Sequence, residues 1–458
     1  MKRFVIFIMF VLLLSNLVFS QGRFTIQNKH RSDKIKFKLI NNLIIIPVKI
    51  NGVTLSFLLD TGVSKPIIFN FLNVSDTLKI KNTETIFLRG LGEGELVEAL
   101  KSNNNIIRIG EAINLSQDLY AIFEANLDLA PKLGFPVHGI IGNDIFSDLI
   151  VEVNYSKEYL KLTEPEAYKY KKCGKCETFN LEFYNGKPYI NAEVTIDSKK
   201  IPVKLLIDSG GSDVLWLFEN DSLGIKSSNA FFNDFLGHGL SGSVYGKRTK
   251  IDALSLKSFV LENANVAYPD SASISIARKF KDRNGSLAGN VLKRFNIIFD
   301  YQKAIITLKK NALFKEKFSY NKSGIELAHD GVRFVKEIDD RILKEKTGLI
   351  RNHDAINSTK IVIDTQYKMS LKPAYTIVEL RNDSPAKKAG LLIGDVVLRI
   401  NNKPTHQFSL QDVMHEFYDD SGKHIRLKVD RNGKVLNFSF NLENPFKKKK
   451  IPKYLGIL

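Results

Sequence analysis

Short apolar stretches separated by turn residues run through the first two thirds of the chain. Leu43 to Ile50 and Val53 to Leu59 are two such stretches, and Asn51-Gly52 between them is a strong hairpin signal. A second pair, Ile190 to Ile196 and Ile201 to Ile207, has the same arrangement. Helical periodicity is weak before about residue 310. The pattern therefore predicts a mostly β fold.

Four short motifs recur in the same order, 146 to 148 residues further along the chain. They are Asp60-Thr61-Gly62 with Asp208-Ser209-Gly210, Gly90-Leu91-Gly92 with Gly237-His238-Gly239, Ile140-Ile141-Gly142-Asn143 with Leu287-Ala288-Gly289-Asn290, and Val153-Asn154-Tyr155 with Phe299-Asp300-Tyr301. Chance matches would not keep this register, so we expect a duplicated unit. Its repeats are residues 34–165 and 179–312, joined by a linker at 166–178.

Asp60 and Asp208 each follow an apolar strand directly, at equivalent places in the two repeats. A carboxylate at the end of a buried strand is costly unless it is paired or hydrogen-bonded. An Asp before Thr-Gly or Ser-Gly can also simply cap a turn. If the repeats face each other across a pseudo-two-fold axis, the two carboxyl groups meet and share one proton. One partner could then act as general base on a water while the other polarises a substrate carbonyl.

These motifs resemble the pepsin/retropepsin-like aspartic proteases, and the resemblance covers roughly residues 34–310. It implies a bilobal double β-barrel with Asp60 and Asp208 as the catalytic pair, and it requires no cofactor and no metal. The similarity also implies that Thr61 and Ser209 brace the two loops together. The supporting positions it implies are the loop glycines Gly62 and Gly210, the glycines behind the loops, Gly142 and Gly289, and two substrate-covering flaps containing Gly90, Gly92 and Gly94 in one and Gly237, Gly239 and Tyr245 in the other.

Two departures from that family bear on the pH of activity. The first flap has no Tyr, and the residue after each Asp-Thr/Ser-Gly motif is Val63 or Gly211, where a hydroxyl donor often occurs in acid-active members. Loss of a donor to a carboxylate removes an interaction that lowers its pKa. We therefore expect an activity optimum nearer neutral than strongly acidic.

The C-terminal third resembles a PDZ domain of the bacterial protease type, with expected bounds of 318–444. The run Ser384-Pro385-Ala386 through Ala389-Gly390-Leu391, followed by Gly394-Asp395, carries the resemblance. In addition, Gly324, Ile325 and Leu327 resemble that family's carboxylate-binding loop, which implies a peptide C-terminus as a partner; an ordinary strand start is the alternative. A charged insertion is expected at about 336–372, and a basic tail at 445–458.

The N-terminus predicts export. Lys2 and Arg3 precede an apolar run from Phe4 to Leu14, and Ser20 ends a plausible signal peptide at 1–20. The run is shorter than a bilayer span, so we expect a periplasmic or secreted protein without a stable transmembrane anchor, although an uncleaved anchor is the alternative. In an exported chain, Cys173 and Cys176 favour a short disulfide in the linker.

Other chemistries find little support in the sequence. The net charge of +18 is spread along the chain without a nucleic-acid-binding motif, so we expect a solvated basic surface and no nucleic-acid partner. Neither His-Glu-x-x-His nor Gly-x-Ser-x-Gly occurs. The sequence thus predicts an aspartic-type endopeptidase acting on a peptide or protein substrate. The alternative is a catalytically inactive bilobal peptide-binding scaffold, although both Asp motifs are intact.

Overall fold

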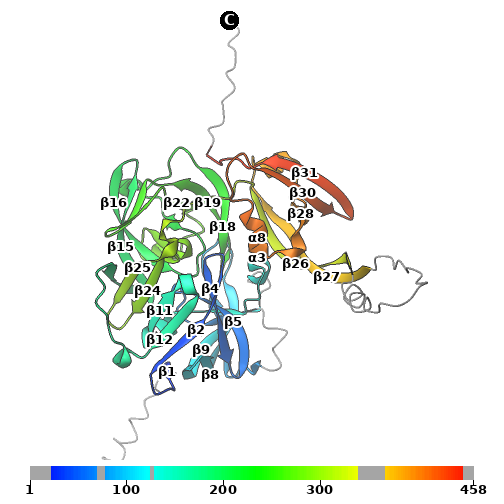
Figure 1. The fold of residues 1–458 in the computed structure, drawn as a ribbon. Helices are drawn as coiled ribbons and strands as arrows, with labels where there is room; N and C mark the ends of the chain where they lie inside the picture. The colour runs from blue at the N-terminus through cyan, green and yellow to red at the C-terminus, as the bar shows by residue number, and fades with distance from the viewer. Residues whose placement is uncertain (1–21, 70–77, 124–127, 339–366, 447–458) are drawn as a thin grey trace, which may run out of the picture. The chain divides into compact units, whose positions relative to one another are not determined.

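The computed structural model describes residues 22–69, 78–123, 128–338 and 367–446 (Figure 1). The chain divides into two compact units. Among the described residues, the first comprises those from 22 to 129, 136 to 320 and 445 to 446, and the second comprises 130–135 and those from 321 to 444. A large hydrophobic core lies in the first unit and a separate one lies in the second.

The first unit is built almost entirely from three β-sheets. Nine strands form one sheet: β1 Thr25–Ile26, β3 Lys38–Ile40, β4 Leu43–Ile50, β5 Val53–Leu59, β6 Ile67–Ile68, β7 Thr83–Leu88, β8 Val97–Ile109, β9 Ala112–Ala121 and β10 Gly139–Ile141. Ten form another: β14 Glu182–Tyr184, β15 Lys187–Ile196, β16 Lys199–Asp208, β17 Leu215–Leu217, β18 Phe232–Gly239, β19 Gly242–Lys250, β20 Ala253–Leu256, β21 Phe259–Glu262, β22 Asn265–Pro269 and β23 Gly285–Ala288. The third, six-stranded sheet contains β2 Ser32–Lys36, β11 Ile150–Asn154, β12 Tyr159–Thr163, β13 Cys176–Asn180, β24 Phe295–Asp300 and β25 Ile305–Lys310.

The two larger sheets repeat one strand order. The order β9-β6-β10-β5-β4 in the first matches β22-β17-β23-β16-β15 in the second. In each, the strand that leads to an Asp pairs in parallel with a short later strand, β5 with β10 and β16 with β23. A short helix follows that later strand, α4 Asn143–Asp148 in one case and α5 Gly289–Leu292 in the other. The motif repeat in the sequence is therefore also a repeat of topology.

Both Asp-bearing strands belong to tight hairpins. Asn51 and Gly52 connect β4 to β5 with φ values of 47° and 96°. The corresponding turn between β15 and β16 places Asp197 and Ser198 at φ values of 48° and 63°. Two successive residues of positive φ match the right-handed twist of the flanking strands. Asn and Gly accept that conformation easily, whereas Ser198 is held there by the pairing on either side.

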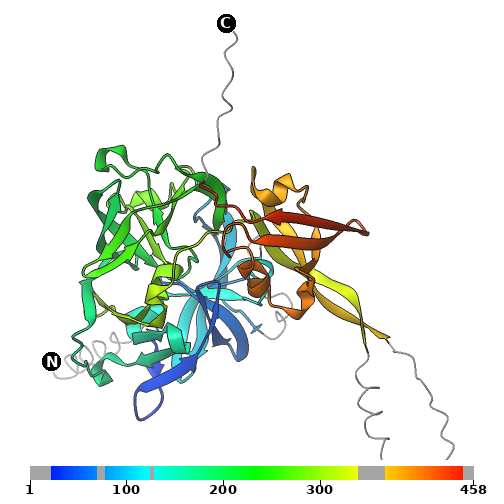
Figure 2. The same cartoon turned by 45° about the horizontal axis from the view of Figure 1, so that its top comes forward.

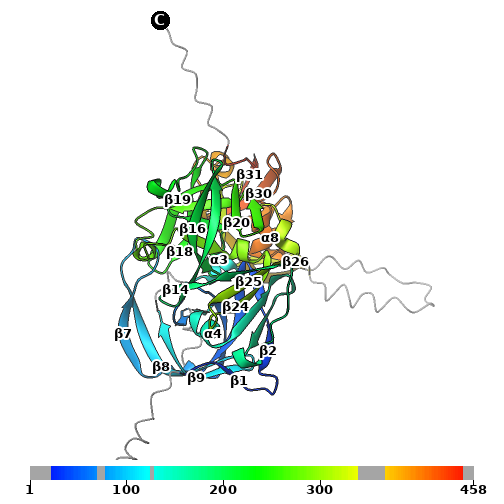
Figure 3. The ribbon, with the colours of Figure 1, turned by 90° about the vertical axis from the view of Figure 1, so that its left-hand side faces the viewer.

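The six-stranded sheet joins the two repeats directly. Its central pair, β11 with β24, is antiparallel, and the neighbouring strand β25 lies beside β24 (Figure 3). In the register, Val151 lies opposite Phe299 and Val153 opposite Ile297. Because the sequence motifs equate Val153 with Phe299, this pairing is symmetric about the Glu152–Ile298 pair. The pseudo-two-fold axis therefore passes through that pair.

The first unit extends beyond the bounds expected from the sequence at both ends. Phe24 is 1% exposed and Thr25 in β1 pairs with Ile113, so ordered structure precedes residue 34. The expected linker ends within β13, and its Cys173 and Cys176 form a disulfide.

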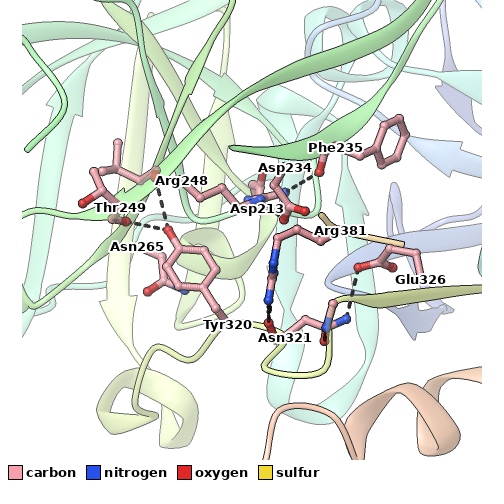
Figure 4. Close-up of polar contacts among 12 residues, drawn as sticks. Asp213, Asp234, Phe235, Arg248, Thr249, Asn265, Tyr320, Asn321, Glu326 and Arg381 are labelled. Atoms are coloured by element: carbon pink, nitrogen blue, oxygen red, sulfur yellow. Dashed lines mark hydrogen bonds and ion pairs between the residues drawn. The ribbon is translucent and has the colours of Figure 1, made fainter. Parts of the chain in front are cut away.

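At the far end of the unit, the Tyr320 hydroxyl donates to the Thr249 carbonyl at 2.6 Å (Figure 4). The same view shows the neighbouring Arg248, whose guanidinium pairs with Asp213 at 2.7 Å and Asp234 at 2.9 Å. The burial of Arg248 is thus compensated by two carboxylates.

The second unit is a β-sheet with short helices (Figure 2). Its elements are α3 Ala130–Leu133, β26 Ile325–Ile338, β27 Tyr367–Leu380, α7 Pro385–Lys388, β28 Val396–Ile400, β29 Lys403–Pro404, α8 Leu410–His415, β30 His424–Arg431 and β31 Lys434–Asn441. Ser384 caps α7, and Ser409 with Asp412 forms a capping box at α8. At the place of the expected insertion, the described part of the chain shows β26 continuing to Ile338 and β27 beginning at Tyr367, and the remainder lies outside the described residues. Within the described ranges, no helix is both long and apolar enough to cross a membrane.

Candidate active site

Asp60 and Asp208 lie at the ends of equivalent strands and close to each other. The backbone N–H of Asp60 donates to the Ile141 carbonyl of β10 at 2.8 Å, which fixes where its strand ends. A Cβ atom added to Gly62 would lie 3.0 Å from Asp60 Oδ1 and 3.9 Å from Asp208 Oδ1. Asp60 Oδ1 and Asp208 Oδ1 thus both lie within 3.9 Å of one point, so the two carboxyl groups are neighbours.

Thr61 and Ser209 tie the two loops together reciprocally. Thr61 Oγ1 donates to the Ile207 carbonyl at 2.6 Å, and Ser209 Oγ donates to the Leu59 carbonyl at 2.8 Å. Each hydroxyl also accepts from the other loop, with Thr61 N at 3.0 Å from Ser209 Oγ and Ser209 N at 3.1 Å from Thr61 Oγ1. Both residues are buried. Four hydrogen bonds related by the pseudo-two-fold axis thus hold the aspartates in fixed positions.

The glycines of the two loops make room for the Asp60 carboxyl group. Gly62 N donates to Asp60 Oδ1 at 2.7 Å. A Cβ on Gly210 would lie only 2.3 Å from both Cγ and Oδ2 of Asp60. Because real Cβ atoms do not approach so closely, any side chain at position 210 would displace this carboxyl group.

Gly142 and Gly289 let a short helix approach the back of each loop. A Cβ on Gly142 would lie 1.9 Å from the Asp60 carbonyl oxygen. The equivalent Cβ on Gly289 would lie 2.7 Å from the Gly211 carbonyl oxygen, and Gly289 N donates to that oxygen at 2.7 Å. Both positions predicted from the sequence therefore support the loops from behind.

Burial and mutual repulsion favour a proton on this pair of carboxyl groups. Burial, together with the negative charge of Asp208, raises the pKa of Asp60 to about 7, although hydrogen bonds from Gly62 and Gly210 and the charge of Lys187 oppose the shift. Burial also raises the pKa of Asp208, against the charges of Arg283 and Lys187. Below about pH 7 the Asp60 carboxyl group is therefore expected to hold a proton.

Lys187 and Arg283 are the two residues of this site that the sequence did not indicate. In the register of β15 with β16, Tyr189 lies opposite Leu206, so Lys187, two residues earlier, lies level with Asp208. Arg283 is 8% exposed, and its Nη2 donates to Ser286 Oγ at 2.6 Å. Neither residue belongs to a recurring motif. Only the strand register and the long reach of each side chain bring them to the aspartates.

The two predicted flaps meet at their tips. Gly94 N donates to the Ser241 carbonyl at 2.7 Å, Gly90 N donates to Ser241 Oγ at 3.1 Å, and Ser241 N donates to the Leu91 carbonyl at 2.9 Å. A Cβ on Gly92 would lie 2.5 Å from the Ser241 carbonyl oxygen. Close backbone approach therefore requires these glycines, and the β7–β8 connection contacts the β18–β19 turn.

The remaining residues of the second flap differ in their surroundings. Gly239 takes part in the tip contact, because its Cβ would lie 2.2 Å from the Leu91 carbonyl oxygen. Gly237 has open space around it and lies at a bulge between β18 and β19. The Tyr245 side chain is 46% exposed and packs edge-on against Phe235. Neither Gly237 nor Tyr245 is brought to the aspartates by any described contact.

The expected carboxylate-binding loop of the second unit is hydrogen-bonded internally. Asn321 Oδ1 accepts from Ser323 N at 3.0 Å and from Gly324 N at 3.1 Å, and Ser323 Oγ accepts from Ile325 N at 3.0 Å. Figure 4 shows Asn321 with Arg381, which donates to the Asn321 carbonyl. Leu327, like Ile325, is buried in the core of this unit. A peptide carboxylate would have to compete with Asn321 and Ser323 for these N–H groups.

The segment 130–135 also packs within the second unit. Gln411 Nε2, on α8, donates to the Leu133 carbonyl at 2.5 Å, and Leu133 is 5% exposed. A Cβ on Gly134 would lie 2.9 Å from Leu410 Cβ. This segment therefore lies against the helix α8.

The described residues contain no group of three or more His, Cys, Asp or Glu side chains arranged to hold a metal ion. The mostly β architecture of the chain carries a PDZ domain in its second unit, since the family described as the PDZ domain matches residues 331–442. No curated protein matches the chain.

Proposed function

We propose that this chain is an aspartic-type endopeptidase whose catalytic pair is Asp60 and Asp208. The observation that carries the proposal is the reciprocal bracing of their loops by Thr61 and Ser209. A turn-capping Asp needs neither a second carboxyl group nor a buried brace. Two buried carboxyl groups with raised pKa values destabilise the fold, and such groups cluster at functional sites.

The pair can hydrolyse an amide without a covalent intermediate. The ionised carboxylate takes a proton from a water held between the two groups, and the resulting hydroxide attacks the substrate carbonyl carbon. The protonated carboxyl group donates its proton to the carbonyl oxygen, which gives a neutral tetrahedral diol. In the collapse of the diol, the carboxyl group that now holds the proton gives it to the amine nitrogen, the other carboxylate takes a proton from a diol hydroxyl group, and the C–N bond breaks, so that the pair again holds a single proton.

The meeting of the hairpin tips supports a role as two flaps that close over a bound peptide. Their contact consists of a few backbone hydrogen bonds around Gly90, Gly94 and Ser241, which can open at modest cost. The N-terminal pattern at residues 1–20, which lie outside the described residues, supports export. The PDZ domain supports a peptide partner, because PDZ domains bind peptides.

The test is cleavage of a quenched-fluorescence peptide library between pH 3 and pH 8 by the wild type and by Asp60→Asn and Asp208→Asn. Residues that act as one unit should each abolish cleavage alone. The matched control is Asp282→Asn, whose side chain is 67% exposed and which should cleave as the wild type does. Cleavage that survives either active-site substitution would exclude the pair. A wild type that binds peptides but cleaves none at any pH would instead be a peptide-binding scaffold.

A further inference from the structure

A small pocket in the first unit is lined by positive charge. Its volume is about 170 Å³, and its walls contain Arg278, Lys281 and Arg283 together with two phenylalanines and two asparagines. No carboxylate lines it. Among the described residues, none of the three cations has a carboxylate oxygen within 4.0 Å, although ion pairs form at other places.

Arg283 is built into the wall of this pocket. Its Nε donates to the Gly285 carbonyl at 3.1 Å and its Nη2 to Ser286 Oγ at 2.6 Å. The guanidinium also lies 5.2 Å from the centre of the Phe218 ring. The hydrogen-bond partners of this buried arginine are neutral, and the one carboxyl group whose charge it faces is that of Asp208.

The strand register places this guanidinium beside the aspartates. Ser286 of β23 and Tyr189 of β15 both lie opposite Leu206 of β16. Leu206 and Asp208 are two residues apart on one strand, so their side chains share a face at a separation of about 7 Å. Because Arg283 is bonded to Ser286, this guanidinium of the pocket wall lies on the face of the sheet that bears the Asp208 carboxyl group, and its charge acts on that group.

Positive side chains outnumber negative ones at this pocket. A pair of aspartates that shares one proton carries one negative charge, while Lys187 and Arg283 together carry two positive charges. Arg278 and Lys281 add to this excess at the pocket. Arg278 donates to the backbone carbonyl of Glu219 at 3.1 Å, whereas the Glu219 carboxylate pairs with Lys247.

We propose that this pocket is a substrate subsite for an acidic side chain, an Asp or Glu of the peptide next to the bond that is cut. The inference rests on the proposed peptidase function, whose substrate class it specifies. The carboxylate would take charge-assisted hydrogen bonds from Arg283 at the floor and from Arg278 or Lys281 at the rim. Its aliphatic part would pack against the phenylalanine rings.

The test uses peptides that are identical except for Glu, Gln or Lys at each of the positions flanking the cleaved bond, assayed near pH 6.5. At one of these flanking positions, kcat/KM should be roughly 10- to 100-fold higher for the Glu peptide than for the Gln peptide, as expected for hydrogen bonds to a charged group. The double variant Arg278→Gln, Lys281→Gln should lose most of that preference while it still cleaves the Gln peptide. The matched control is Lys279→Gln, an exposed neighbour that does not line the pocket and should keep the preference.

A second readout needs no catalysis. Asp60→Asn should bind a fluorescent Glu peptide more tightly than its Gln counterpart, and adding the double substitution to it should remove most of that difference. Equal kcat/KM for Glu and Gln at every position, with cleavage that still requires Asp60 and Asp208, would overturn the subsite and leave the peptidase intact. Cleavage of no peptide by the wild type would overturn both.

Discussion

The substitution Asp60→Asn should stabilise the first unit at alkaline pH while it abolishes catalysis. The Asp60 pKa of about 7 lies well above the value near 3.9 that an unfolded chain would show. A carboxyl group with a raised pKa stabilises the fold most fully below its unfolded pKa, and that stability is lost as the pH rises through the folded value. Asn keeps the side-chain oxygen that accepts from Gly62 N but cannot ionise.

The size of the effect follows from the difference between the two pKa values. Three units correspond to about 4 kcal/mol of unfolding free energy, all of it lost by pH 8 and almost none of it lost at pH 4. For a folding unit of roughly 300 residues, this corresponds to about 6 °C in Tm. The variant should therefore melt about 6 °C above the wild type at pH 8 and within about 1 °C of it at pH 4.

Scanning calorimetry at both pH values measures the difference, and the exposed control Asp282→Asn should show none. A gain of equal size at pH 4 and pH 8 would show that the effect is not ionisation of the buried carboxyl group. A variant that is less stable than the wild type at pH 8 would show that the ionised Asp60 carboxylate does not destabilise the folded state.

Three further predictions follow from the same residues and from the second unit. Activity should fall as the pH rises above about 7, where the pair loses its shared proton. Because the charge of Lys187 lowers the pKa of Asp60, Lys187→Met should move this alkaline limb of the kcat/KM profile to higher pH. A limb that does not move would exclude that role of Lys187. Gly210→Ala should lower kcat at least 100-fold in steady-state assays, since its Cβ would displace the Asp60 carboxyl group, whereas Gly174→Ala, with nothing within 4 Å, should leave kcat unchanged. Asn321→Ala should bind a peptide with a free C-terminus more tightly than the wild type does, with no such gain for the amidated peptide, as measured by fluorescence anisotropy. Equal affinities of wild type and variant for the free peptide would show that Asn321 does not compete for the loop N–H groups.

The catalytic candidates were visible in the sequence because they recur. Asp60 and Asp208 lie at matching points of two repeats, and the apolar stretches before them define strands whose ends can be predicted from local periodicity. The structure places β4 and β5 at the bounds expected from that pattern. Local alternation of apolar and polar positions is set within a few residues, so it can be recognised without the fold.

Lys187 and Arg283 could not be found in this way. Their position near the aspartates depends on the strand register and on how far their long side chains reach from the backbone. Neither of these can be recognised in a local sequence pattern. The hydrogen bonding of Asn321 to the loop at Gly324 was missed for the same reason, since a side chain that satisfies a neighbouring backbone resembles any other turn residue in sequence. Tyr245 stays a prediction, because no substrate is present against which its expected contact could be tested.

The symmetric pairing of β11 with β24 has a consequence for how such a chain could have arisen. If each half were expressed alone and paired with its own copy across the same axis, the residue on the axis would face itself. Two copies of the first half would set Glu152 against Glu152, a repulsive contact, whereas two copies of the second would set Ile298 against Ile298. At this position the second half could therefore pair with its own copy, whereas the first half could pair only with the second without placing like charges together.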